Sequence, residues 1–305
     1  MVFPLSRLST EADASRSAAS AEPVAAVNSR FSPWLTPIVY PLARASAEPV
    51  AAVNSRFSPW LTPIVYPLAR RLVLPLYFGD ITVSGQEHLP TDGPVILAPT
   101  HRARWDAILV PFATGRGVTG RDLRFMVSAD EVSGLQGWFI RRLGGFPVDT
   151  KRPTIASLRH GVEVLQHGEM LVIFPEGGIF RDGDVHPLKP GLARLAIQAE
   201  MSQPNLGVKI VPISLQYSDS YPRWGTTVKI QIDRPFQVAD YCQGSAKQDA
   251  KRLTADLELR LKELSGQVVP ARELAIASHT KRNLPASQSS YIQQCRVHEP
   301  HLPAS

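Results

Sequence analysis

The chain has little cysteine and no long apolar run. Cys242 and Cys295 are the two cysteines among 305 residues. They provide neither a disulfide framework nor the paired spacing of a zinc site, and a reducing compartment fits. No stretch reaches the roughly eighteen uncharged apolar residues of a membrane-spanning helix. Residues 1–18 include acids and lack an apolar core, which argues against a secretory signal; an organellar transit peptide is the alternative.

Two kinds of motif are also missing. There is no helix-turn-helix, zinc-finger or RNP signature and no basic tract with interleaved aromatics, so we expect no nucleic-acid partner. There is no Gly-x-Ser-x-Gly motif, and neither cysteine lies in a matching context. The chain therefore offers no serine or cysteine nucleophile of its own, and we expect no metal or other cofactor.

The charge of the chain is positive and unevenly placed. The formal net charge is +6, and 44% of the residues are hydrophobic, enough for the core of one large α/β domain or two small ones. Residues 101–152 contain nine Lys and Arg against five Asp and Glu. Such a region attracts phosphate, nucleic acid or an anionic membrane surface, and a solvated basic face is the alternative.

The N-terminal region contains an exact tandem repeat. Residues 19–44 are repeated letter for letter by residues 45–70. Solenoid repeats diverge and need several copies to stack, so an identical pair indicates a recent duplication or an artefact of the gene model. We expect a fixed role only for the second copy, which adjoins the rest of the chain.

The second copy continues into an apolar segment that extends to Phe78. Prolines recur every four residues at positions 59, 63 and 67, which opposes one long regular helix. The aromatic residues and the pair Arg70-Arg71 are typical of an arm that lies in a membrane interface. An apolar arm that packs on its own domain is the alternative. We assign residues 1–78 to a leader that ends in this arm.

Strand-like and helix-like segments alternate from Ile81 onward. This alternation predicts an α/β fold over residues 79–268, with a largely parallel sheet flanked by helices. Beyond it the composition turns polar without periodicity, so we expect residues 269–305 to be disordered. The expected strands cover residues 81–85, 94–98, 123–127, 146–148, 170–174, 208–217 and 226–232; helical spacing covers 104–112, 135–143, 155–165, 192–201 and 253–264.

A histidine and an aspartate follow the second expected strand. His101 thereby lies at the carboxyl end of a strand, where open α/β sheets place their ligand crevices. A neutral imidazole accepts a proton near pH 7. If the chain tightens, the carboxylate of Asp106 reaches one ring nitrogen and fixes the tautomer. The nucleophile is then a substrate hydroxyl, and the electrophile is already activated, such as a thioester. The alternative is an ordinary helix-start histidine and an exposed aspartate.

A second polar turn, Phe174-Pro175-Glu176-Gly177, follows the strand over residues 170–174. In a parallel sheet this turn reaches the same crevice. Gly177 permits close backbone approach to a ligand. Glu176 either accepts a hydrogen bond from a hydroxyl or holds an arginine, and the alternative is a turn carboxylate in a salt bridge. We predict that this turn binds substrate.

Cations follow two of the expected strands. Lys151 and Arg152 come just after the strand over residues 146–148 and have the charge to grip a phosphate, the arginine through a bidentate fork. An ordinary exposed pair before a helix is the alternative. Arg181, beyond the Glu176 turn, is a further candidate for substrate binding.

The order of these motifs resembles the four blocks of the glycerolipid acyltransferases, in particular the bacterial 1-acyl-glycerol-3-phosphate acyltransferase group. The resemblance extends from Ile81 to Tyr217. It implies transfer of a fatty acyl group from acyl-CoA or acyl carrier protein to a lysophospholipid, by an enzyme peripheral to the cytoplasmic face of a membrane. The blocks read Thr100-His101-x4-Asp106, Gly145-Phe-Pro-Val-Asp149 with Lys151-Arg152, Phe174-Pro-Glu-Gly177, and Val211-Pro212-Ile213.

The same resemblance implies roles for the residues. His101 is the base and Asp106 its orienter, the second and third blocks bind the glycerol phosphate, and the fourth lines the pocket. Two departures concern the acceptor: Thr150 lies near the usual second-block Arg, and Gly178-Ile179 replace the usual Thr-Arg. The family also usually has Asn where this chain has Thr100. A non-catalytic lipid-binding protein and an O-acyltransferase for another alcohol are therefore alternatives.

Overall fold

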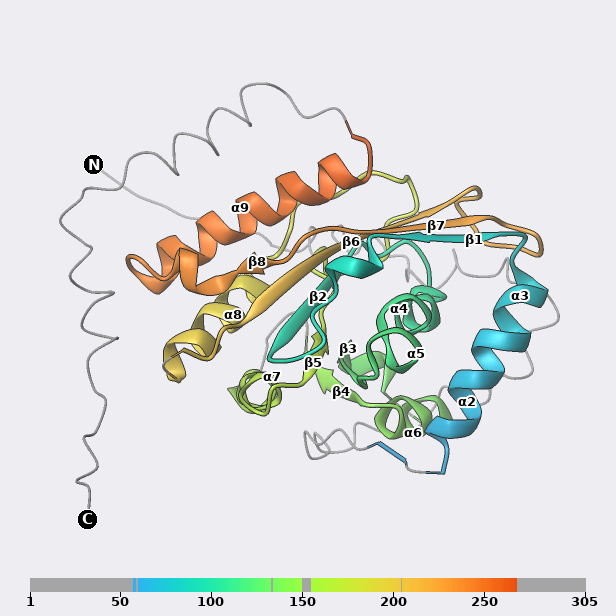
Figure 1. Ribbon diagram of the computed structural model, residues 1–305, viewed down its shortest axis with the longest axis horizontal. Helices are drawn as coiled ribbons and strands as arrows, with labels where there is room; N and C mark the ends of the chain where they lie inside the picture. Colours follow the sequence, from blue (N-terminus) through green and yellow to red (C-terminus); the bar gives the residue numbers. More distant parts are fainter. Residues whose placement is uncertain (1–56, 59, 133, 150–154, 204, 268–305) are drawn as a thin grey trace, which may run out of the picture. The chain divides into compact units, whose positions relative to one another are not determined.

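The computed structural model describes residues 57–58, 60–132, 134–149, 155–203 and 205–267 (Figure 1). The first repeat copy, the cations Lys151 and Arg152, and the tail over residues 269–305 lie outside the described residues, so the expectations for them stay predictions. The described strands form one eight-stranded sheet. They are β1 (Ile81–Ser84), β2 (Val95–Pro99), β3 (Leu123–Ser128), β4 (Gly145–Val148), β5 (Met170–Val172), β6 (Lys209–Tyr217), β7 (Val228–Ile232) and β8 (Phe236–Gln237).

Helices connect most of these strands. They are α2 (Thr62–Leu68), α3 (Leu74–Tyr77), α4 (Asp106–Thr114), α5 (Arg116–Thr119), α6 (Gly134–Arg142), α7 (Ile155–Gln166), α8 (Gly191–Ser202) and α9 (Ala246–Leu264). The apolar stripe that predicted the last helix begins only at Leu253. Its real start is marked by Ser245, whose side chain accepts a hydrogen bond from the Gln248 backbone N–H. This Ser-x-x-Gln pattern is the signal of a helix start that the apolar spacing alone does not give.

The sheet is largely parallel, as predicted. Its order is β1-β7-β6-β2-β5-β3-β4, with β8 paired to β6. β2 lies between β5 and β6 and pairs in parallel with both. β7 runs antiparallel to β6, because the link over residues 218–227 has no helix and is too short for a parallel crossover. Because β2 and β5 are parallel neighbours, their carboxyl ends meet at one edge of the sheet.

Both faces of the sheet are buried, which explains the continuous apolar runs of its central strands. In β2, Ile96 and Ala98 join the core formed with α7, α8 and α9. Val95 and Leu97 point to the other face and join the core formed with α3 and α4. Figure 1 shows α8 and α9 on one side of the strands and α3 and α4 on the other.

The arm is helical despite its prolines. α2, a π-helical turn over Ala69–Val73 and α3 follow one another without a break. Pro63 is tolerated in the first turn of α2, and the wider π turn comes just before Pro75, which has no N–H to donate. The prediction that the prolines oppose one regular helix is confirmed, because a π-helical turn separates α2 from α3. The segment nevertheless stays helical from α2 to α3. Among the described residues, no helix is long and apolar enough to cross a membrane.

One side of the arm packs on its own domain. Leu74 is fully buried and Phe78 nearly so. The Arg70 guanidinium donates a hydrogen bond to the Phe112 carbonyl at 2.9 Å, so this arginine contacts the protein. The opposite side of the arm exposes Ile64, Leu68, Leu72 and Leu76, each between 48% and 61% exposed. Packing and exposure thus divide the arm into two faces.

Candidate active site

His101 lies where the chain leaves the sheet. Thr100 still pairs with β6, since its N–H donates to the Ile213 carbonyl and its hydroxyl accepts from the Leu215 N–H, both at 2.9 Å. The following residues form a tight connection to α4, which begins at Asp106. The predicted location of His101 at the carboxyl end of a strand is confirmed. Thr100, in the place of the usual Asn, anchors this loop to the neighbouring strand.

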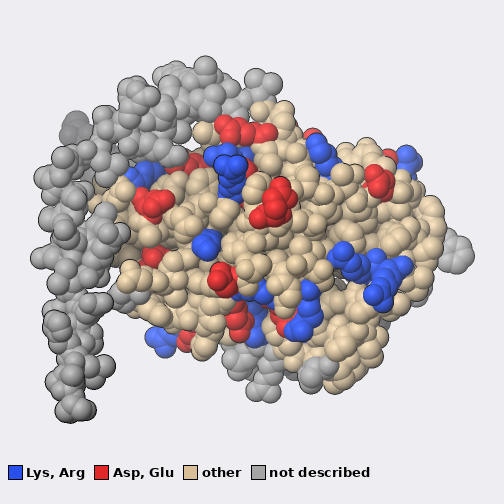
Figure 2. Space-filling model, in the orientation of Figure 1, with Lys and Arg blue, Asp and Glu red and all other residues tan. Residues whose placement is uncertain are grey.

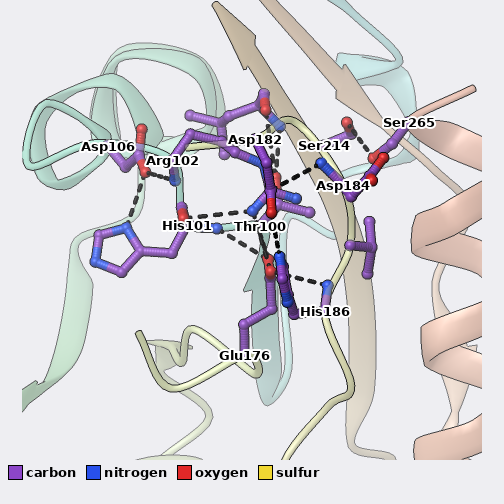
Figure 3. Close-up of polar contacts among 12 residues, drawn as sticks. Thr100, His101, Arg102, Asp106, Glu176, Asp182, Asp184, His186, Ser214 and Ser265 are labelled. Carbon is purple, nitrogen blue, oxygen red and sulfur yellow. Dashed lines mark hydrogen bonds and ion pairs between the residues drawn. The ribbon is translucent and has the colours of Figure 1, made fainter. Parts of the chain in front are cut away.

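The carboxylate of Asp106 holds the imidazole of His101. The His101 Nδ1 lies 2.8 Å from the Asp106 Oδ2 (Figure 3). The same oxygen accepts hydrogen bonds from the backbone N–H groups of Arg102 at 2.6 Å and Ala103 at 2.9 Å. An ionised carboxylate only accepts, so Nδ1 carries the proton and Nε2 has the free lone pair. The side chain of Asp106 is 0% exposed and that of His101 is 19% exposed, so the imidazole is partly exposed while the carboxylate is sealed.

Tyr217 completes the support of Asp106. Its hydroxyl donates a hydrogen bond to Oδ1, the carboxylate oxygen that does not face His101. The sequence interpretation did not select this residue. A signal was present: β6 is longer than β2, and the last residues of such a strand extend past the end of its neighbour toward the crevice.

The Phe174 turn reaches the same edge, as predicted. The Phe174 ring stacks on the His101 imidazole, with ring centroids 3.9 Å apart and planes inclined by 21°. Pro175 is buried, and its carbonyl accepts the Lys189 N–H. Gly177 has a φ of 68°, and a Cβ at this position would lie 2.6 Å from the Lys189 side chain. The backbone conformation therefore favours glycine here, whereas the close atoms are the flexible end of the exposed Lys189 side chain, which can move.

Glu176 holds an arginine, which fits both an expected role and the alternative of a turn carboxylate in a salt bridge. The Arg102 Nη1 donates to both carboxylate oxygens of Glu176 at 3.0 Å. The backbone N–H groups of His101 and His186 also donate to this carboxylate, each at 3.2 Å. The Glu176 side chain is 0% exposed and that of Arg102 is 5% exposed. Glu176 thus joins the His101 loop to its own turn, and in the described structure its carboxylate faces protein donors instead of solvent.

A second histidine–aspartate pair lies beyond the turn. The His186 Nε2 is 2.7 Å from the Asp182 Oδ2, and the His186 ring stacks on Phe180 with centroids 3.9 Å apart. The Asp182 side chain is 52% exposed. Its pKa is lowered, chiefly by the hydrogen bond from His186. In Figure 3 the His101 ring points to the left, away from Glu176, and His186 lies to the right of the His101 ring, close to Glu176.

Of the three cations predicted to bind substrate, Arg181 lies within the described residues and contacts an aromatic ring. The Arg181 guanidinium lies over the Tyr221 ring, 4.9 Å from its centroid. Several cations of the basic segment over residues 101–152 are engaged within the protein, and Figure 2 shows acidic and basic side chains intermixed on the visible face. Arg104 and Arg116 stay largely exposed in their ion pairs, so both interpretations of that segment, an anion-binding region and a solvated basic face, stay predictions. The ion pairs are Arg102–Glu176, Arg104–Glu131, Arg116–Asp122 and Arg124–Glu169.

Residues 80–216 match the family model described as Acyltransferase. The chain carries an acyltransferase domain. The match starts just before β1 and ends within β6, so it contains both His101 and the Glu176 turn. The fold itself continues further, because Leu253, Leu257 and Leu261 of α9 belong to the core on one face of the sheet.

Named relatives are similar to this acyltransferase domain. The 1-acyl-sn-glycerol-3-phosphate acyltransferase of Bacillus subtilis (strain 168) is 27% identical over 193 residues, which cover 62% of this chain and 90% of that protein. The protein of the same name from Streptococcus pneumoniae is 28% identical, over 48% of this chain and 49% of its own length. The mitochondrial glycerol-3-phosphate acyltransferase 1 of Rattus norvegicus is 24% identical, over 62% of this chain and 27% of its own length.

A solved structure shares the fold. The crystal structure of the 1-acyl-sn-glycerophosphate (LPA) acyltransferase PlsC from Thermotoga maritima superposes with a TM-score of 0.51 at 21% identity. The superposition covers 69% of this chain and 82% of that chain. This likeness supports the α/β architecture of the acyltransferase domain.

Proposed function

We propose that this protein transfers a fatty acyl group from acyl-CoA or acyl carrier protein to the hydroxyl of a lysophospholipid, 1-acyl-sn-glycerol-3-phosphate, in phospholipid biosynthesis. The observation that carries the proposal is the His101–Asp106 pair, with a sealed carboxylate on Nδ1 and a reachable ring. The relatives named as 1-acyl-sn-glycerol-3-phosphate acyltransferases support the choice of acceptor.

His101 acts as a general base in the proposed reaction. Its Nε2 takes the proton of the acceptor hydroxyl while that oxygen attacks the thioester carbonyl carbon. The carbonyl π electrons move to oxygen, and the resulting imidazolium is stabilised by Asp106. When the tetrahedral intermediate collapses, the C–S bond breaks and the thiolate receives the proton from His101. The products are the new ester and the free thiol, and no acyl-enzyme forms.

The neighbouring residues have separate tasks. Phe174 supports the flat face of the imidazole, while Pro175, Glu176 and Gly177 fix the turn beside it. Arg181 is partly exposed and supplies charge to the acceptor phosphate from beyond the turn. We assign the remaining grip on the phosphate to Lys151 and Arg152, which follow β4 in the chain. Arginine suits this task because its planar fork matches a phosphate group.

An acylation assay tests the reaction. Purified protein with lysophosphatidate and an acyl-CoA or acyl carrier protein is expected to form phosphatidate, and the His101→Ala variant should be slower on the order of a hundredfold or more. Equal rates in the variant and the parent protein would contradict the mechanism. Binding of lysolipid vesicles without turnover on any acceptor would favour a non-catalytic lipid-binding protein.

Another alcohol is the second candidate acceptor. The observation that favours it is the altered third block, where Gly178 and Ile179 replace the usual Thr-Arg and Arg181 lies over an aromatic ring. A panel of phosphorylated and uncharged alcohols separates the candidates. If the natural acceptor carries a phosphate that Arg152 binds, Arg152→Ala should raise KM for lysophosphatidate. The same change should leave the turnover of uncharged alcohols unchanged. Equal effects on both acceptor classes would contradict a phosphate role for Arg152.

The exposed face of the arm supports a peripheral site on a membrane, which we place at its cytoplasmic face. Ile64, Leu68, Leu72 and Leu76 recur every four residues and form one exposed stripe. Trp60 and Trp138 are exposed nearby, with ring centroids 6.3 Å apart. Tryptophan favours the interface between lipid and water. Since Arg70 contacts the protein, the exposed Arg71 is the cation that we assign to lipid headgroups.

Vesicle sedimentation tests the stripe. The double change Leu68→Glu and Leu72→Glu should lower the fraction bound to anionic vesicles, because two charges would enter the apolar phase. Met201→Glu is the matched control, since Met201 is 62% exposed on α8 and lies outside the stripe. Removal of residues 1–44 should leave binding intact, because the second repeat copy remains. Equal binding by the double variant and the control would contradict docking through the arm.

A further inference from the structure

The two oxygens of the Asp106 carboxylate have different partners. Oδ2 faces Nδ1 of His101 and the backbone N–H groups at the start of the loop. Oδ1 accepts a hydrogen bond from the Tyr217 hydroxyl. A carboxylate that is held on both oxygens cannot rotate about its terminal bond without losing a partner. The tyrosine therefore fixes the plane in which Oδ2 meets the imidazole.

Tyr217 comes from a rigid part of the fold. The pairing of β2 with β6 ends at Pro99 and Ile213, and the last residues of β6 continue past it. Tyr217 still pairs with Val228 of β7. Its ring lies 6.3 Å from that of Phe78 at the end of the arm. Strand pairing and this aromatic neighbour hold the phenol in place on the α4 side of the sheet.

The phenol acts as a donor at all pH values where the enzyme would work. Burial, followed by the negative charge of Asp106, raises the pKa of Tyr217 far above its usual value. The hydroxyl therefore keeps its proton beside the carboxylate. Its hydrogen bond withdraws part of the negative charge that would otherwise act on the His101 imidazolium. Arg102 and Glu176 pair with each other, and the His101 ring points away from Glu176.

We propose that Tyr217 is a positioning residue for acyl transfer, which orients the Asp106 carboxylate toward Nδ1 of His101 and tempers its charge. This inference rests on the proposed function of His101 as the base. Without the hydroxyl, the carboxylate gains rotational freedom and its charge is less compensated. The first effect slows proton transfer, and the second holds a proton on the imidazole more firmly.

Kinetics of Tyr217→Phe test both effects. The variant keeps the ring and loses the hydroxyl, so kcat should fall roughly threefold to tenfold, the size of one typical intramolecular hydrogen bond, while KM for lysophosphatidate stays within about twofold. The acid limb of the pH profile of kcat/KM should move to higher pH. Tyr241→Phe is the matched control, because its hydroxyl donates to Asp256 at 2.8 Å and it belongs to the core on the other face of the sheet.

Nitrogen NMR of the histidine rings gives a readout that needs no turnover. In the parent protein the His101 ring, assigned by comparison with His101→Ala, should carry its proton on Nδ1. In Tyr217→Phe its titration midpoint should rise, and in Tyr241→Phe it should not move. An unchanged midpoint, tautomer and pH profile in Tyr217→Phe would overturn the positioning role. A parent protein that acylates no acceptor, together with a moved midpoint, would contradict the proposed function and leave the positioning of His101 by Tyr217 standing.

Discussion

Two histidine–aspartate pairs have nearly the same local geometry and different surroundings. His101 and Asp106 are separated by 2.8 Å, and His186 and Asp182 by 2.7 Å. Each imidazole stacks on a phenylalanine with ring centroids 3.9 Å apart. However, the Asp106 side chain is 0% exposed, whereas that of Asp182 is 52% exposed. The carboxylate's burial distinguishes the pairs better than the contact distance does.

The nitrogen that each aspartate engages is also different. Asp106 binds Nδ1 of His101, so the outer nitrogen, Nε2, is available to a substrate. Asp182 binds Nε2 of His186, which leaves only the nitrogen nearest the backbone. A base must reach its proton within hydrogen-bond distance. The comparison therefore favours His101 over His186 as the proposed base.

Glu176 connects the two pairs, and its removal should have the largest effect. Glu176→Gln keeps the shape but leaves Arg102 buried without an opposite charge. Loss of one partner of a buried ion pair costs about 3–5 kcal/mol, which chemical denaturation would measure as a lower free energy of unfolding. The control is Glu131→Gln, because the pair Arg104–Glu131 is exposed and should contribute only about 0–1 kcal/mol. Similar losses in the two variants would show that burial of Glu176 does not control its contribution.

The two histidines should differ most in activity. His101→Ala removes the base and should lower kcat/KM on the order of a hundredfold or more. His186→Ala removes an equally well-bonded imidazole and should change it by less than about threefold, because a surface pair contributes little. Both variants would be assayed with the same lysolipid. A larger loss in His186→Ala would reverse the assignment of the two pairs.

The two aspartates should repeat this contrast on a smaller scale. Asp106→Asn removes the charge that stabilises the imidazolium, and kcat should fall roughly tenfold or more. Asp182→Asn should leave kcat within about twofold, since its carboxylate is mostly solvated. Circular dichroism would check that both variants stay folded. Equal kcat values in Asp106→Asn and the parent protein would remove Asp106 from the mechanism.

The smallest effect concerns acid stability at the second pair. The pKa of Asp182 is lower in the folded state than in the unfolded chain. Its contribution is therefore present above the unfolded pKa, which is about 4, and is lost as pH falls through the lower folded pKa. Denaturation of the parent protein and Asp182→Asn should differ slightly at pH 6 and converge in that acid range. A difference that grows with acid would contradict the sign of this linkage.

Local patterns were sufficient for much of the fold. Every predicted strand matches a described strand to within two residues at each end, since apolar runs of strand length report burial on both faces. The arm was harder to predict from its prolines. Their cost depends on where they fall in a helix, and the π turn before Pro75 is a local adjustment that spacing does not reveal. The start of α9 required the Ser245 cap rather than apolar spacing.

The candidate site was only half visible in the sequence. His101 and Asp106 are five residues apart, so one loop brings them together. Tyr217 and Asp106 are 111 residues apart, and their contact depends on the pairing of β6 with β2. The fate of the basic segment was also invisible, because the acids that neutralise Arg102 and Arg124 come from elsewhere in the chain.

The sequence by itself determined the α/β class and the nearness of His101 to Asp106, because both depend on short-range spacing. It also supplied the order of motifs that resembles the acyltransferases. Tertiary structure alone decided which His–Asp pair is sealed, that Glu176 holds Arg102, and that Tyr217 reaches Asp106. Burial and long-range hydrogen bonds are properties of the packed sheet, and they arise only when strands distant in the chain lie side by side.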